Sequence, residues 1–294
     1  MSSFVRKLLY GEERKKDFTE ANLPVTRREQ FGYVIKRRGF RLLAINTGVF
    51  TFFIPVLLWR MLCLAYESSF DNITIDNVSA YIQYVIYYKS IPRAVCMGVA
   101  GLGLAGGFHA IRMIVWGEPV GTARSFLRGI RYSFVQYFIG GMLYGVFCMI
   151  IEIVEVMIYS GYISDKSMKI LAMGSIVLSK FLLVASGMFA MALLSNYNIK
   201  VLHCIKNSIL LVMGSLFKTA GFIILSLGPS ILWFVTGYIF MDIIGILILL
   251  LCGFAYSLLI WCLYTNSIFD RYINQKNYPE YYRKGLRKER NHNA

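Results

Sequence analysis

The chain has 294 residues, of which 57% are hydrophobic and only 16% are charged, and its mean hydropathy is +0.56. Soluble globular domains carry about 25% charged residues, so this composition excludes an ordinary soluble domain and indicates a membrane protein. The net charge of +15 does not indicate a nucleic-acid partner, because membrane proteins concentrate Lys and Arg in their cytoplasmic segments.

The pattern of apolar stretches predicts an all-α, polytopic membrane helix bundle with about six transmembrane helices. Residues 1–41 form a basic cytoplasmic N-terminal segment, residues 42–266 the six-span membrane domain, and residues 267–294 a basic cytoplasmic tail. The first apolar run begins only after a long polar segment, so we expect no cleavable signal peptide. The expected spans are 42–66, 91–116, 133–159, 170–194, 216–234 and 242–264.

Amphipathic segments flank these spans. Residues 78–88 are rich in tyrosine and isoleucine and predict an interfacial helix before the second span. The second span carries many glycines, which we interpret as allowing close helix packing rather than lining a permeation path. The basic amphipathic stretches 126–134 and 204–218 are expected to be bent helices on the cytoplasmic face. They indicate either a weak internal repeat or simple hairpin topology.

Basic residues determine the predicted orientation. They gather in both terminal segments and in the connections 112–131 and 200–218, so the positive-inside rule places both termini in the cytoplasm of a cell-membrane protein. An even number of spans agrees with this. The predicted basic cytoplasmic surface, which could meet anionic lipid or an acidic protein, comprises Arg112, Arg124, Arg128, Arg131, Lys200 and Lys206.

Charges inside the spans are the sharpest candidates for a site. Glu152 and Glu155 share a helix face in the third span, and Lys180 lies near the middle of the fourth. An unpaired charge in the bilayer costs roughly 2.5–3.5 kcal/mol on insertion scales, so a partner is expected. We predict a Glu152–Lys180 ion pair, which either fixes helix register or lines a polar cavity. Gly228 and Pro229 predict a helix break in the fifth span.

Catalytic and metal-binding patterns are not found. The sequence contains no phosphate-binding glycine loop, HExxH motif or Ser/His/Asp arrangement. The six cysteines form no CxxC pair, and three scattered histidines are too few for a metal site. We therefore expect no metal, no cofactor and no enzymatic activity.

A family resemblance is carried by residues 105–134. Ala105, Gly106 and Gly107, an arginine five residues before Gly117-Glu118, then Phe126 and an Arg-x-x-Phe ending at Phe134 resemble the YesL-like family. A second segment, Lys206-Asn207-Ser208 with Leu210-Leu211, resembles it too. The likeness covers about residues 39–270, although Trp116 and the long basic N-terminal segment depart from the family pattern. The resemblance implies a bacterial membrane protein of unassigned molecular function, associated with carbohydrate uptake.

Three functions remain open at this point. The first is a non-enzymatic accessory or scaffold protein, with the lipid bilayer and a transporter or other membrane protein as partners. The second is a small-solute transporter or channel with a polar site between spans 3 and 4, for which a homodimer is expected. The third, a membrane enzyme, has the least support.

Overall fold

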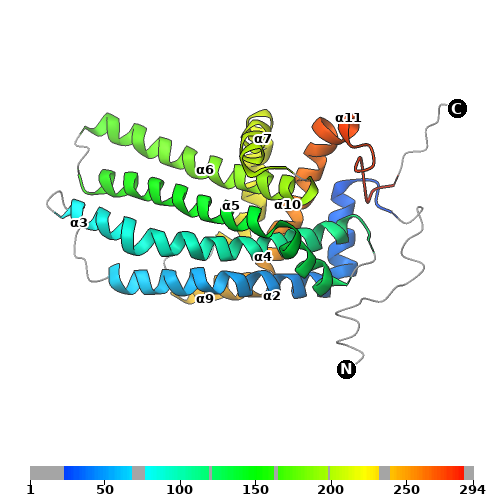
Figure 1. Cartoon of the computed structure of the whole chain (residues 1–294), viewed down its shortest axis with the longest axis horizontal. Helices are drawn as coiled ribbons and strands as arrows, with labels where there is room; N and C mark the ends of the chain where they lie inside the picture. Colours follow the sequence, from blue (N-terminus) through cyan, green and yellow to red (C-terminus); the bar gives the residue numbers. More distant parts are fainter. Residues whose placement is uncertain are drawn as a thin grey trace, which may run out of the picture. The chain divides into compact units, whose positions relative to one another are not determined.

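A computed structural model describes residues 23–67, 77–118, 121–161, 165–197, 199–231 and 239–287. These residues are helical almost throughout, without a β-strand among them (Figure 1). Five of the helices are long and apolar enough to cross a membrane, and a sixth crossing is counted if one sharply bent helix pair is a single span. The predicted membrane-type helical fold is therefore confirmed, and the expected six spans depend on that bent pair.

The helices follow one another with short connections. Together α3, η3 and α4 make one apolar helix, Val78–Val115, so the expected interfacial helix at 78–88 is continuous with the second span. In chain order the elements, of which those marked η are π-helices, are α2 (Arg27–Glu67), α3 (Val78–Gln83), η3 (Tyr84–Ser90), α4 (Ile91–Val115), α5 (Thr122–Tyr159), α6 (Lys166–Asn196), α7 (Val201–Gly214), α8 (Leu216–Ile231), α9 (Ile239–Ile248), η5 (Leu249–Gly253), α10 (Phe254–Phe269), η6 (Asp270–Asn274) and α11 (Gln275–Asn277).

Three of the helical stretches are interrupted by one residue with non-helical backbone angles. Arg38 interrupts α2 (φ −124°, ψ 16°), Ser133 interrupts α5 (φ −122°, ψ 25°), and Ser215 separates α7 from α8 (φ −140°, ψ 29°). Each interruption follows a basic stretch of sequence. The stretches ending at Ser133 and Ser215 are those expected to bend, and α7 and α8 meet at an angle of 99°.

The chain forms two compact units. Thr51–Leu104 and Phe134–Ala220 make one, which we call the central unit, and Met1–Phe50, Ala105–Ser133 and Gly221–Ala294 make the other, the terminal unit. Residues 1–22 and 288–294 of the predicted terminal segments lie outside the described residues.

Glycines bring α4 and α5 together in the central unit. A Cβ added to Gly141 would lie 2.3 Å from the carbonyl oxygen of Met97, and one added to Gly101 would lie 2.5 Å from that of Tyr137. A Cβ added to Gly145 would lie 2.7 Å from the Cα atom of Ala94. These glycines therefore allow backbone contact between helices, as the packing interpretation predicted.

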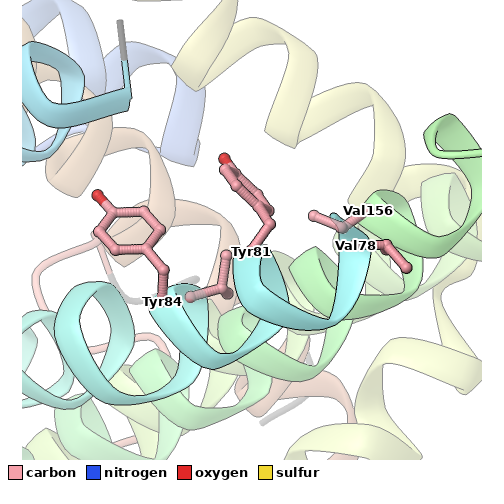
Figure 2. Close-up of a cluster of buried hydrophobic side chains, with 5 residues drawn as sticks. Val78, Tyr81, Tyr84 and Val156 are labelled. Carbon is pink, nitrogen blue, oxygen red and sulfur yellow. The ribbon is translucent and has the colours of Figure 1, made fainter. Parts of the chain in front are cut away.

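A cluster of buried hydrophobic side chains lies where the Val78–Val115 helix begins and α5 ends. Val78, Tyr81, Tyr84 and Val85 pack with Val156 of α5, and Figure 2 shows the two tyrosines rising from the α3–η3 helix. These buried contacts fix the first turns of the long Val78–Val115 helix against the last turns of α5.

A buried asparagine organises the terminal unit. The side-chain amide of Asn46 donates to the carbonyl oxygens of Leu249 (3.0 Å) and Leu250 (2.6 Å), and its oxygen accepts from the backbone N–H of Ala255 (3.0 Å). The π-helix η5 shifts its backbone hydrogen bonds out of α-helical register. The Asn46 side chain on α2 binds three backbone groups, two in η5 and one at the start of α10. An apolar environment without water requires such internal partners.

The predicted helix break at Gly228 and Pro229 stays a prediction, because residues 232–238, which follow the end of α8, lie outside the described residues. The helix α8 continues through both residues to Ile231, and the bend is at Ser215. Its position follows from local hydrogen bonds: the Ser215 hydroxyl donates to the Leu211 carbonyl (2.7 Å), and the Thr219 hydroxyl donates to the Ser215 carbonyl (2.9 Å). These side chains bind the backbone groups next to the bend.

Candidate functional site

Four charged side chains form a cluster in the central unit. The ammonium of Lys89 forms ion pairs with both Glu67 and Glu152, and Nη1 of Arg93 lies 2.6 Å from Glu152. The Lys89 side chain is only 5% exposed, and the other three are 17–18% exposed. The charges of the two cations and the two carboxylates therefore cancel within a largely buried cluster.

Helix geometry explains this cluster. Lys89 and Arg93 are four residues apart on one continuous helix, so both face the same direction. Glu152 approaches them from α5, and Glu67 is the last residue of α2. Trp59 and Ser90 add polar contacts, since the Trp59 indole donates to the Lys89 carbonyl (3.0 Å) and Arg93 donates to the Ser90 hydroxyl (3.1 Å).

The predicted Glu152–Lys180 ion pair is wrong in its partner. Lys180 contacts Glu155 instead, with 2.5 Å between Nζ and the carboxylate. A Cβ added to Gly187 of α6 would lie 3.9 Å from the Tyr144 ring of α5, and counting seven residues along each antiparallel helix from this contact brings Lys180 near position 151. Side chains tilt toward the N-terminus of their own helix, however, and this tilt carries the Lys180 ammonium one turn further, to Glu155.

The two ion pairs differ in exposure. The Lys180 side chain is 53% exposed and that of Glu155 is 28% exposed, whereas Lys89 is buried. The site predicted from the sequence did not include Lys89 or Arg93, although Arg93 lies within the expected second span. Their spacing of four residues, in an aromatic and apolar stretch, was the sequence feature that indicated two cations on one helix face.

Most of the predicted basic surface is exposed. Arg124, Arg128 and Arg131 are exposed on the part of α5 before Ser133, and their spacings of four and three place them on one face. Lys200 and Lys206, at the start of α7 and within it, are exposed as well. These five residues are available to a partner or to lipid headgroups.

Arg112, the sixth predicted surface residue, is buried. Its side chain lies 3.0 Å from Nδ1 of His109 and stacks over the Trp116 ring, 4.7 Å from the centroid. Trp116 also stacks on Tyr281 with 5.4 Å between ring centroids, and the Lys284 ammonium lies 4.1 Å from the Trp116 centroid. The end of α4 thus binds the C-terminal segment through an aromatic and cationic contact.

The two described chain ends meet in the terminal unit. Arg27 forms an ion pair with Asp270 at 2.7 Å, and the backbone N–H of Arg287 donates to the carbonyl of Pro24 (2.9 Å). The Gln30 amide donates to the Val115 carbonyl, which ends α4 (2.6 Å). The predicted basic tail therefore folds onto the unit as far as Arg287.

The described parts of the chain hold no group of three or more His, Cys, Asp or Glu side chains close enough to share a metal ion.

Comparisons of the chain with models of protein families, with curated proteins and with solved structures gave no match. The resemblance to the YesL-like family therefore stays a prediction, and function has to be argued from the geometry.

Proposed function

We propose that the chain is a non-enzymatic membrane protein that serves as an accessory or scaffold subunit in a bacterial membrane. The observation that best supports a scaffold is the balanced cluster of Glu67, Lys89, Arg93 and Glu152. A link to carbohydrate uptake follows from the YesL-like resemblance.

The internal charges suit a structural role. Each carboxylate of the cluster contacts a cation from another helical segment, so the ion pairs join α2, the Val78–Val115 helix and α5. Removing one member of a buried pair leaves an uncompensated charge, so such a cluster holds helices in fixed register. A rigid scaffold requires helices held in fixed register, whereas the charged groups of a transport site must exchange one binding partner for another.

The position of the cluster along α5 favours the same interpretation. Glu152 follows Phe134, the first residue after the Ser133 bend, by 18 positions, which is about 27 Å of helix. The hydrocarbon core of a bilayer is about 30 Å thick. If the bend marks one membrane boundary, the charge cluster lies at the other boundary, where charged groups cost less than at the centre.

The topology supports a cytoplasmic working face. The hydrogen bond from the Arg287 N–H to the Pro24 carbonyl supports the placement of both described ends on one side of the membrane, with which an even number of crossings agrees. Six crossings meet this condition when the bent α7–α8 pair is one span. The positive-inside rule then assigns that side to the cytoplasm.

The arginines before the Ser133 bend are the proposed partner-binding surface. Arg124, Arg128 and Arg131 are exposed on one helix face, and residues 122–133 include no Asp or Glu. A surface of this kind favours an acidic protein partner through complementary charge.

Cross-linking in native membranes followed by affinity purification tests the proposal. The Arg124→Gln, Arg128→Gln, Arg131→Gln triple variant should lose the partner that the wild type retains. The matched control is Lys166→Gln with Lys169→Gln, which removes charge from the N-terminal turn of α6. Recovery of the wild-type protein without any partner would contradict a subunit role.

Solute transport is a second candidate, and the Lys180–Glu155 pair favours it. More than half of the Lys180 side chain is exposed, so this pair can meet a polar solute more readily than the buried cluster can. Uptake by proteoliposomes that falls in Glu155→Gln would support transport. Uptake unchanged in that variant would remove this site from consideration.

A further inference from the structure

The helix α7 has three distinct faces. Cys204, Ser208 and Val212, spaced by four residues, are buried, and the Cys204 thiol contacts the Ala190 carbonyl of α6 at 3.4 Å. A second face, roughly 120° away by helical periodicity, carries the exposed apolar side chains of Leu202, Ile209 and Met213.

The third face of α7 is polar. It exposes His203 and Asn207, whereas Lys206 lies within the apolar face, between Met213 and the exposed Leu210. Residues 199–218 include Lys200, Lys206 and Lys218 but no Asp or Glu. An amphipathic helix with cations beside its apolar face is typical of helices that lie in a membrane surface.

The bend at Ser215 gives this helix a fixed direction. The helix axes of α7 and α8 differ by 99°, so α7 runs nearly parallel to the bilayer if the apolar helix α8 crosses it. The hydrogen bonds of Ser215 and Thr219 hold the bend. Phe217, immediately after the bend, has a side chain that is 90% exposed.

We infer that α7 is an in-plane membrane helix that binds anionic phospholipid. Leu202, Ile209 and Met213 face the acyl chains, and Lys206 with Lys218 contacts the negatively charged headgroups. Apolar side chains this exposed beside lysines fit a lipid surface better than an acidic protein, because only lipid offers apolar chains and anionic phosphate together. This inference is independent of the proposed accessory role, since it needs only the membrane and not a protein partner.

Spin labels on the full-length protein in nanodiscs test the orientation. We expect a nitroxide at Ile209→Cys to be accessible to oxygen and protected from a water-soluble nickel chelate. The matched label at Asn207→Cys, two residues away on the polar face, should show the reverse. The six native cysteines are replaced by alanine in this background. Access of the nickel chelate to both positions would overturn the in-plane orientation.

Photo-cross-linking on the protein with its native cysteines tests the lipid. Nanodiscs of equal phosphatidylglycerol and phosphatidylcholine carry a photoreactive acyl chain on one lipid or the other, and labelling of α7 is compared. We expect preferential labelling by phosphatidylglycerol, which falls about fivefold for each lysine removed in Lys206→Gln and Lys218→Gln. Lys166→Gln, at the other end of α6, should leave the preference unchanged. Equal labelling by both lipids, or a preference that survives the double variant, would overturn the assigned site.

Discussion

Nη1 of Arg93 lies 2.6 Å from the carboxylate of Glu152, and this ion pair joins the Val78–Val115 helix to α5. Lys89, one turn earlier, binds the same carboxylate and also Glu67. One glutamate therefore holds two cations, and its loss affects the whole cluster.

Replacement of Glu152 by glutamine should be costly. The variant leaves Lys89 and Arg93 with a single carboxylate, Glu67, in a largely buried place. We expect it to lose on the order of 3 kcal/mol of stability, because a buried charge loses its partner. Thermal unfolding in detergent measures the loss.

Glu155→Gln is the matched control for that experiment. Its partner Lys180 is more than half exposed, and if the pair lies at the membrane boundary, water screens it, so we expect a cost below about 1 kcal/mol. Equal losses in the two variants would contradict the structural role assigned to Glu152.

The neighbouring glycines of α5 should respond oppositely to alanine. A Cβ at Gly141 would lie 2.3 Å from the Met97 carbonyl oxygen, so Gly141→Ala must push α4 and α5 apart and should cost about 1–3 kcal/mol. A Cβ at Gly140 meets nothing within 4 Å, and Gly140→Ala should gain up to about 1 kcal/mol from helix propensity. Thermal unfolding of both variants checks the contrast, and a loss at both positions would contradict the close approach.

Asn46→Ala should destabilise the terminal unit. It removes the partners of the Leu249 and Leu250 carbonyls and of the Ala255 N–H, and leaving such groups unpaired costs about 1–3 kcal/mol. Hydrogen exchange of residues 249–255 should speed up. Thr47→Ala, on the exposed side of the same turn, is the control and should leave that exchange unchanged.

Trp116→Ala should loosen the C-terminal segment. The variant removes the stacking with Tyr281 and the contact with the Lys284 ammonium, which together are worth about 1–3 kcal/mol. Hydrogen exchange at residues 278–287 should therefore become roughly tenfold faster or more. Tyr272→Ala removes an exposed aromatic from the same region and should have little effect. Equal effects of the two variants would show that Trp116 does not anchor this segment.

The helical membrane character could be predicted from the sequence, because apolar length and charge distribution determine it directly. The small residues of the second span indicated close packing, and Gly101 does contact the backbone of α5. Gly228 and Pro229 were expected to break the fifth span, and a sharp bend of 99° lies earlier, at Ser215. Ser215, with Thr219 one turn later, was the weaker signal that marked the bend.

Pairing of charges could not be predicted from depth alone. Lys180 pairs with Glu155 and not with Glu152, because the direction of its side chain also decides the partner. Arg112 was expected on the surface because it borders a basic connection. Only the contact between Trp116 and the distant Tyr281, 165 positions later in the chain, explains why this region is covered.

The interleaved order of the two units has a consequence for biosynthesis. Both segments of the central unit, 51–104 and 134–220, have been synthesised before Gly221 is translated. The terminal unit receives its last segment, 221–294, only at the end of translation, so Leu249 and Leu250, which bind Asn46, are synthesised after the central unit is complete. A nascent chain stalled near Ile231 would carry every residue of one unit and an unfinished version of the other, and it is this second part that chaperones and membrane proteases would encounter first.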